Sequence, residues 1–189
     1  MNERNNPALR GDALTRRQII FGAAVAFGGL TLGSSAARAA EDELSRTAES
    51  IHEEVTFNAT PARVYEILTV AAQFEKVVKL SAAMQSGMAP AKKSAMLRGA
   101  PGGAFSLFGG YVTGRNIELV PAKRVVQAWR AASWPAGVYS IVKFELSPDS
   151  SGTKLVFDQA GFPQDDAAHL VPGWYDNYWK PMARVLATP

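Results

Sequence analysis

The sequence predicts an α+β fold in which a curved antiparallel β-sheet wraps around a long C-terminal α-helix, with two short helices after the first strand. Three observations lead to this fold class. One strand-like segment precedes two helical segments, alternating apolar residues dominate from residue 104 onward, and the chain ends in a helical segment. An antiparallel sheet has to bury one face, and the terminal helix is the segment available to cover it.

The first strand is predicted for the segment SIHEEVTF, which begins at Ser50. Its apolar and polar residues alternate, as is typical of a half-buried strand. The exception is Glu53, which falls on the apolar side. His52 falls on the opposite side, and we expect it to face solvent as an ordinary strand residue.

Two helices follow the first strand. Thr60 is suited to cap a helix whose first residue is Pro61, because a proline there gives up no helical hydrogen bond. A second short helix is expected around Phe74 and Val78. The remaining strands are expected as hairpins because turn residues separate the alternating segments; these turns lie at Gly109-Gly110, at Pro121-Ala122 and at residues 148–152.

The segment GWYDNYWKP predicts the terminal helix itself. Trp174 and Tyr178 lie four residues apart and are expected on its inner face, while Tyr175 and Trp179 form a second pair on an adjacent face. Pro181 removes a backbone hydrogen bond, so we expect a local bend there.

The start of the terminal helix is expected at Pro172 and Gly173. Asp165 and Asp166 lie shortly before it. With His169 they could form a metal site or an acid–base pair. The favoured interpretation is that the two carboxylates stabilise the positively polarised end of the helix.

The first 39 residues predict an export signal of the twin-arginine type, and residues 40–49 a flexible leader before a domain at residues 50–189. Arg16 and Arg17 lie in the pattern Thr-Arg-Arg-x-hydrophobic-hydrophobic, which precedes a weakly apolar run. Ala37 and Ala39 form an A-x-A cleavage site. The expected partner is the twin-arginine translocase and the expected location the periplasm; the alternatives are a general secretory signal or, without cleavage, an N-terminal membrane anchor.

Composition excludes several function classes. The chain has no cysteine and two histidines, so thiolate chemistry and a multi-histidine metal site are excluded, and we expect neither a metal nor a cofactor. All of the net charge of +3 lies in residues 1–39. Residues 40–189 carry no net charge, so they lack the basic surface of a nucleic-acid-binding protein. Nor is the mature domain expected to be embedded in a membrane.

The aromatic residues that follow position 104 indicate either a packed core or an apolar ligand pocket, and polar residues near them could supply partners for indole and phenol groups. The candidate ligand-binding residues are Phe108, Tyr111, Arg115, Gln127, Trp129, Trp134, Phe157, Gln159, Trp174 and Tyr178. No arrangement of residues predicts a catalytic reaction, so catalytic residues are assigned to none of these positions.

The segments LFGGYVTGRNIELVPAKRVVQAWR, SWPAGVYS and GWYDNYW resemble, in order and spacing, the C-terminal domain of the activator of Hsp90 ATPase (Aha1-like) family. The resemblance covers residues 51–186. That domain belongs to the START-like, helix-grip superfamily, and the resemblance implies the same curved sheet around a terminal helix. Superfamily members often hold small apolar ligands between sheet and helix, some are enzymes, and the Aha1-like branch is linked to contact with a chaperone.

Three functions therefore remain open at the level of sequence. The leading hypothesis is a non-enzymatic, exported domain that binds a hydrophobic or lipid-like small molecule between the sheet and the C-terminal helix. The first alternative is a protein-interaction module resembling a co-chaperone. The second is an enzyme acting on an apolar or aromatic small molecule, which would require an acid or base with a strongly shifted pKa inside a pocket.

Overall fold

The computed structural model describes residues 49–87 and 94–188. The predicted export signal, with Arg16, Arg17, Ala37 and Ala39, and nearly all of the predicted leader lie outside the described residues. The domain that follows is described below by itself.

Within the described residues, seven strands form one antiparallel sheet in the order β1-β7-β6-β5-β4-β3-β2. The first strand pairs with the last, so that β1 and β2 form the two edges of the sheet, and a bulge between Asn116 and Glu118 interrupts the register of β4 with β5. The strands are β1 (Ser50–Phe57), β2 (Met96–Leu97), β3 (Ala104–Leu107), β4 (Val112–Val120), β5 (Arg124–Ala131), β6 (Ser140–Asp149) and β7 (Gly152–Ala160).

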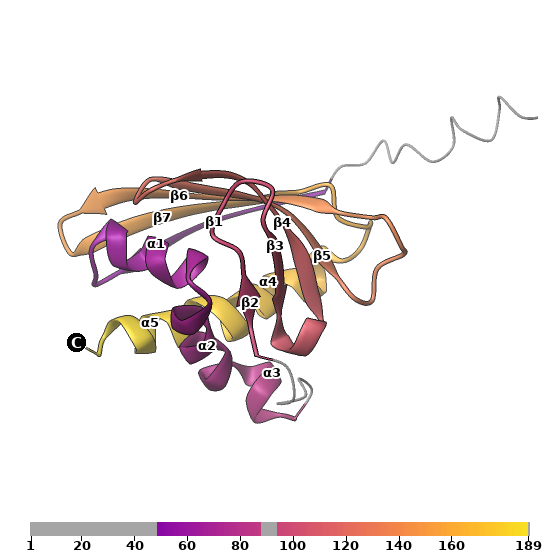
Figure 1. Ribbon diagram of the computed structural model, residues 1–189, viewed down its shortest axis with the longest axis horizontal. Helices are drawn as coiled ribbons and strands as arrows, with labels where there is room; N and C mark the ends of the chain where they lie inside the picture. Colours follow the sequence, from indigo (N-terminus) through magenta and orange to yellow (C-terminus); the bar gives the residue numbers. More distant parts are fainter. Residues whose placement is uncertain (1–48, 88–93, 189) are drawn as a thin grey trace, which may run out of the picture. The chain divides into compact units, whose positions relative to one another are not determined.

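The helices lie on one side of the sheet, as Figure 1 shows. They are α1 (Pro61–Thr69), α2 (Ala71–Leu80), α3 (Ala82–Gln85), the 3₁₀ turn η1 (Phe108–Gly110), α4 (Ala167–Trp174), the π-helical turn η2 (Tyr175–Trp179) and α5 (Lys180–Leu186). The Thr60 hydroxyl accepts a hydrogen bond from the Arg63 amide at 3.4 Å, so helix α1 begins where the sequence predicts. The predicted α+β, helix-grip architecture is confirmed.

The inner face of the sheet, which faces the helices, is apolar and close-packed. Phe144 of β6 and Phe157 of β7 are almost completely buried, with ring centroids 5.5 Å apart. Glu53 of β1 shares this face, as its position in the sequence predicts. Its carboxylate accepts a hydrogen bond from the indole of Trp179, so the polar residue in the apolar half of the strand has a partner in the terminal helix.

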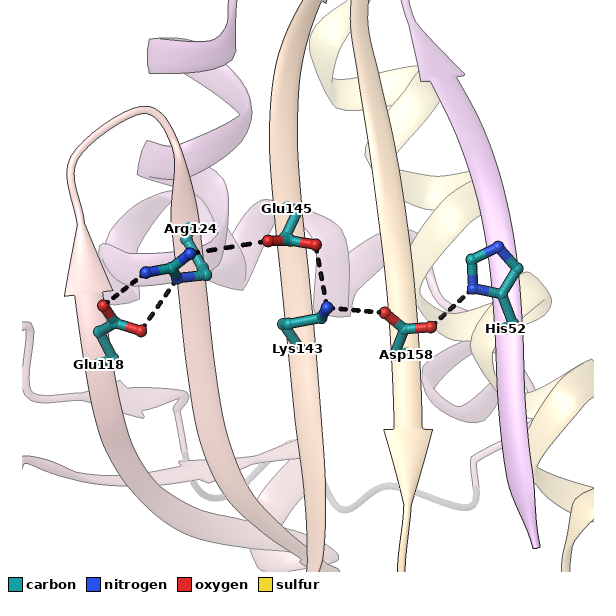
Figure 2. Close-up of polar contacts among 6 residues, drawn as sticks. All are labelled: His52, Glu118, Arg124, Lys143, Glu145 and Asp158. Carbon is teal, nitrogen blue, oxygen red and sulfur yellow. Dashed lines mark hydrogen bonds and ion pairs between the residues drawn. The ribbon is translucent and has the colours of Figure 1, made fainter. Parts of the chain in front are cut away.

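The outer face of the sheet carries a row of alternating charges across five strands (Figure 2). Arg124 lies 2.8 Å from Glu118 and 3.7 Å from Glu145, and Lys143 lies 2.9 Å from Glu145. The row continues from Lys143 to Asp158 at 3.1 Å and from Asp158 to His52 at 2.6 Å. We call these residues the ionic row: Glu118, Arg124, Glu145, Lys143, Asp158 and His52. The predicted solvent-facing position of His52 is confirmed.

The terminal helix begins earlier than predicted, and its hydrogen-bond pattern changes just before Pro181. It begins at Ala167, so Pro172 lies inside α4 and the predicted start at Pro172 and Gly173 is wrong. Before Pro181 the helix widens into the turn η2, in which the Lys180 amide donates to the Tyr175 carbonyl, five residues back. The two α-helical segments α4 and α5 are joined through this wide turn.

The wide turn also corrects the predicted faces of the helix. In a regular α-helix, residues five apart point about 140° away from each other. Here Trp174 and Trp179 stack, with ring centroids 5.5 Å apart and planes inclined by 17°. Trp179 is therefore buried beside Trp174 and Tyr178, whereas Tyr175, its predicted partner, is 57% exposed.

Candidate functional site

A cavity of about 740 Å³ lies between one end of the sheet and the first half of the terminal helix. One wall is formed by β5, the loop that follows it and the segment from η1 to the start of β4. The other wall is formed by α4 and η2. A small part of the lining comes from α3. The lining residues are Ala83, Phe108, Tyr111, Val112, Trp129, Ala131, Ser133, Trp134, Asp166, His169, Leu170, Gly173, Trp174, Asn177 and Tyr178.

Six of the ten candidate binding residues line this cavity: Phe108, Tyr111, Trp129, Trp134, Trp174 and Tyr178. Except for Tyr111, their aromatic rings form a continuous series of contacts. Trp129 lies 5.3 Å from Trp134 and 5.6 Å from Trp174, measured between ring centroids. Phe108 lies 5.4 Å from Tyr178. The walls of the cavity therefore consist largely of aromatic rings packed in edge-to-face and tilted pairs, which fixes their orientation.

The other four candidates do not line the cavity. Phe157 belongs to the packed core, with its ring centroid 4.4 Å from that of Trp174. Arg115 is exposed and donates to the Gly102 carbonyl at 3.0 Å. Gln127 is buried and donates to the Asn116 side chain at 3.0 Å.

Gln159, the fourth, is completely buried and holds the back of the cavity wall in place. The Trp174 indole donates to its side-chain oxygen at 2.7 Å. The Gln159 amide donates to the Ser140 hydroxyl at 2.9 Å, and that hydroxyl donates to the Trp129 carbonyl at 3.2 Å. This chain of hydrogen bonds fixes Trp174 relative to Trp129, so Gln159 supplies an indole partner, as the sequence suggests, without reaching the cavity.

The cavity ends where larger side chains fill the space between sheet and helix. Beyond Trp174, the rings of Phe144 and Phe157 pack against Trp179, at 6.3 Å and 5.2 Å between centroids. Met182 is completely buried in the same half of the interface. The terminal helix thus packs against a filled core around Trp179 and α5, and it borders the cavity along α4 and part of η2.

Asp166 lies at the N-terminus of the terminal helix, where the sequence places it, but its side chain contacts another segment. It occupies the N-cap position of α4, but its side chain makes no capping hydrogen bond. Its carboxylate instead accepts a hydrogen bond from the Trp134 indole. The carboxylate thereby attaches the loop after β5 to the start of the terminal helix, at the rim of the cavity. The preceding Asp165 has a φ of 68°, which shows how tightly the chain turns into α4.

Asn177 connects the turn η2 to helix α3 on the other side of the cavity. Its side-chain oxygen accepts from the Ala83 amide at 2.8 Å, and its side-chain nitrogen donates to the Gly173 carbonyl at 3.0 Å. Ala83 lies 94 residues before Asn177, so the contact with α3 leaves no pattern in the chain. The sequence therefore could not identify Asn177 as a lining residue.

Two of the lining residues carry a buried polar atom without a hydrogen-bond partner among the described residues: the indole nitrogen of Trp129 and the hydroxyl of Tyr178. Trp129 is 4% exposed and Tyr178 5% exposed. Burial raises the pKa of Tyr178, while the neighbouring Trp129 indole acts in the opposite direction. The phenol is therefore neutral and can donate a hydrogen bond.

The described part of the chain contains no group of three or more acidic or histidine side chains placed to hold a metal ion. Of the predicted metal or acid–base set, Asp166 and His169 line the cavity and Asp165 does not. Across residues 49–87 and 94–188, no helix is long and apolar enough to cross a membrane.

A model of the family described as "Activator of Hsp90 ATPase homolog 1-like protein" matches residues 58–187. The chain belongs to this family. The resemblance found in the sequence is thereby confirmed, and with it the helix-grip fold that the resemblance implies.

Curated relatives carry matching names. The activator of 90 kDa heat shock protein ATPase homolog 2 of Mus musculus is 27% identical over 72% of this chain and 38% of its own length. The corresponding homolog of Dictyostelium discoideum is 32% identical over 64% of this chain and 28% of its own. An uncharacterised protein of Schizosaccharomyces pombe is 36% identical over 46% of this chain and 26% of its own. The chain thus spans roughly a quarter to two-fifths of these relatives.

Solved structures show the same fold over most of their length. An HSP90 activator from Plasmodium falciparum superposes with a TM-score of 0.61 at 23% identity, covering 75% of this chain and 97% of that one. A protein from Chromobacterium violaceum superposes with a TM-score of 0.57 at 23% identity, covering 74% and 98%. These structures support the architecture of the domain.

Proposed function

We propose that this domain is a non-enzymatic binding module that holds a hydrophobic small molecule in the cavity between β5 and the terminal helix. The observation that carries the proposal is the cavity of about 740 Å³ with aromatic walls. Small-molecule sites have volumes of about 300–1,000 Å³, mostly apolar walls and a few polar groups, and this cavity has all three.

The cavity is supported from behind, which favours a preformed site. Gln159, Ser140 and the Trp129 carbonyl fix the sheet side, and the carboxylate of Asp166 fixes Trp134 at the rim. A site whose walls are already ordered loses little conformational entropy when a ligand binds. An apolar ligand then gains affinity from the aromatic surface that it covers.

The test is titration of the purified domain with N-phenyl-1-naphthylamine, a neutral apolar dye whose absorption overlaps tryptophan emission. We expect saturable energy transfer to the dye, because Trp129 and Trp134 line the cavity. Ala131→Leu should weaken binding at least about tenfold, because Ala131 is 4% exposed on the inner face and lines the cavity.

The matched control is Ala128→Leu, which adds the same side chain to the same strand on the opposite face. We expect it to leave dye binding unchanged. Gly173→Leu gives a second way to fill the space, since a Cβ at Gly173 meets no atom within 4 Å. Equal dye binding by the original protein, Ala131→Leu and Gly173→Leu would contradict the proposal.

A second candidate function is contact with a chaperone ATPase. It is supported by the names of the relatives, which describe activators of the 90 kDa heat shock protein ATPase. Val171 and Tyr175 offer a surface for it, because they are four residues apart on the terminal helix and are 41% and 57% exposed. If this is the function, we expect the domain to bind a purified 90 kDa heat shock protein ATPase and to raise the rate at which that ATPase hydrolyses ATP. Loss of both effects in Val171→Asp/Tyr175→Ser would locate the contact, and no effect of the original protein would reject it.

We also propose that residues 1–39 direct export through the twin-arginine translocase, so that the domain acts in the periplasm. The support is the twin-arginine pattern with its following A-x-A site. Replacing Arg16 and Arg17 by lysine keeps the charge and should abolish export, measured by cell fractionation. Normal export of this variant would indicate a different signal.

A further inference from the structure

The cavity changes from apolar at its floor to polar at its mouth. The floor residues are aromatic and at most 6% exposed: Phe108, Trp129, Trp134, Trp174 and Tyr178. Three other lining residues, Tyr111, Ser133 and His169, are exposed and mark the side on which the cavity opens to solvent, which we call the mouth. This distribution suits an amphipathic ligand whose apolar body covers the floor while its polar end stays at the mouth.

Asp166 lies at this mouth. Its Oδ2 accepts the indole hydrogen of Trp134, and the neighbouring Ser133 hydroxyl lies 3.4 Å from that of Tyr111. On α4, the His169 amide donates to the Asp166 carbonyl at 3.0 Å. The loop after β5 therefore connects Tyr111 with Asp166, which places the carboxylate beside the exposed lining residues.

The carboxylate of Asp166 still has an acceptor to offer. Its second oxygen, Oδ1, makes no hydrogen bond to any described residue and is not shut off from solvent. Among the described residues that line the cavity, Asp166 is the only acid, and there is no lysine or arginine. Because Asp166 is half-buried, less water competes for this oxygen than for one on an open surface.

The charges just outside the lining leave the mouth negative. Asp165, which is exposed, adds a second carboxylate next to Asp166. Arg130 is not a lining residue, and its guanidinium donates to the carbonyls of Trp134 and Pro135. The positive end of α4 offsets only about half a charge. The mouth therefore favours a cation over an anion.

We propose that the cavity selects amphipathic molecules that carry one protonated amine, and that the ammonium group donates to Oδ1 of Asp166 at the mouth. The inference rests on the proposed binding function and specifies its ligand class. The aromatic floor binds the apolar body, and the carboxylate selects the charge of the polar end. Tyrosine and tryptophan rings, which are abundant here, also attract ammonium groups.

The experiment compares three probes that differ only in the polar end: 4-phenylbutylamine, 4-phenylbutan-1-ol and 4-phenylbutyrate. Isothermal titration calorimetry at pH 8, where imidazole groups are ordinarily uncharged, measures their affinities. We expect the amine to bind about tenfold more tightly than the alcohol, because a charge-assisted hydrogen bond replaces a neutral one. The carboxylate should bind more weakly than the alcohol.

A second readout reports on the carboxylate itself. The indole N–H of Trp134 donates to the same carboxylate that is proposed to bind the ammonium group. In ¹⁵N-edited NMR spectra, 4-phenylbutylamine should therefore shift this resonance beyond any shift that 4-phenylbutan-1-ol causes. Equal shifts with the two probes would count against contact between the amine and Asp166.

Asp166→Asn removes the charge and keeps an oxygen that can accept from Trp134. Its preference for the amine over the alcohol should fall to about threefold or less, while its affinity for the alcohol is retained. Asp165→Asn is the matched control, because it removes an equal charge from the adjacent residue, which does not line the cavity. Asparagine also tolerates the positive φ of that position. This control should retain most of the tenfold preference.

The outcomes separate this inference from the function on which it rests. Equal binding of amine and alcohol, or tightest binding of the carboxylate, would overturn the inference and leave the cavity as an apolar binding site. An equal loss of preference in Asp165→Asn and Asp166→Asn would overturn the direct contact. If Asp166→Asn does not fold, the order of the three affinities and the Trp134 resonance of the original protein still decide. If none of the probes binds up to its solubility limit, both the inference and the proposed binding function fail.

Discussion

The two faces of the sheet belong to the same strands but are stabilised differently, the inner face by apolar packing and the outer face by ion pairs. On the inner face, Phe144 and Phe157 pack against the terminal helix, and the buried polar groups are joined in defined chains such as that of Gln159. On the outer face, the ionic row places charges opposite one another across five strands, at positions where water reaches them. The difference indicates that stability and any binding site depend on the inner face, while the outer face contributes solubility and a modest electrostatic term.

The largest expected effect comes from removing the side chain shared by the core and the cavity. Trp174→Ala should destabilise the domain by about 3–5 kcal/mol, because it deletes a large buried ring. It also leaves the Gln159 oxygen without its donor. Urea denaturation followed by circular dichroism measures the change. Tyr175→Ala, an exposed neighbour, should cost less than about 1 kcal/mol, and equal losses would show that the inner face is not dominant.

A smaller effect is expected from breaking the buried polar chain without creating a large void. Gln159→Leu leaves the Trp174 indole unpaired and should cost about 1–3 kcal/mol in the free energy of unfolding. Part of this loss should be recovered in Gln159→Leu/Trp174→Phe relative to the two single changes, because neither polar partner then remains. Strict additivity in the double-mutant cycle would mean that the hydrogen bond contributes nothing.

On the outer face, Lys143→Met removes the cation between Glu145 and Asp158. The expected loss is about 1 kcal/mol or less, since exposed ion pairs are weak. It should shrink further in 1 M salt, where the screening length falls to about 3 Å. A loss as large as that of Gln159→Leu would remove the contrast between the two faces.

The smallest predicted effect is a change in the acid dependence of stability. Hydrogen bonding to His52, followed by contact with Lys143, lowers the pKa of Asp158. A carboxyl with a lowered native pKa stabilises the fold above its unfolded-state pKa of about 3.9, and this contribution is lost as the pH falls through the native value. In Asp158→Asn, the free energy of unfolding should therefore fall less steeply as the pH is lowered through the acidic range. Parallel curves for the two proteins, measured by urea denaturation, would contradict this assignment.

Sequence patterns predicted the features that depend on neighbours along the chain. The alternation of the strands, the capped start of α1 at Thr60 and the placement of Glu53 on the apolar side were all correct. Each follows from a spacing of two to four residues. The overall fold could be assigned because these local patterns occurred in an order that few architectures satisfy.

Features that depend on contacts across the fold were missed or misassigned. The wide turn η2 rotates Trp179 toward Trp174, and no residue pattern distinguishes it from a regular helical turn. Asp166 was expected to cap its own helix, but the indole of Trp134, 32 residues earlier, is its partner. Arg115 and Gln127 have aromatic neighbours in the sequence, but their side chains bond to backbone and amide groups away from the cavity.

The pairing of β1 with β7 has a consequence for the timing of synthesis. His52 and Asp158, which meet across these strands, are 106 residues apart in the chain. At a synthesis rate of about 5–20 residues per second, roughly 5–20 s pass before the ribosome supplies the partner of the first strand. Because the terminal helix that covers the sheet is made later still, the domain reaches its final fold only after this helix has left the ribosome.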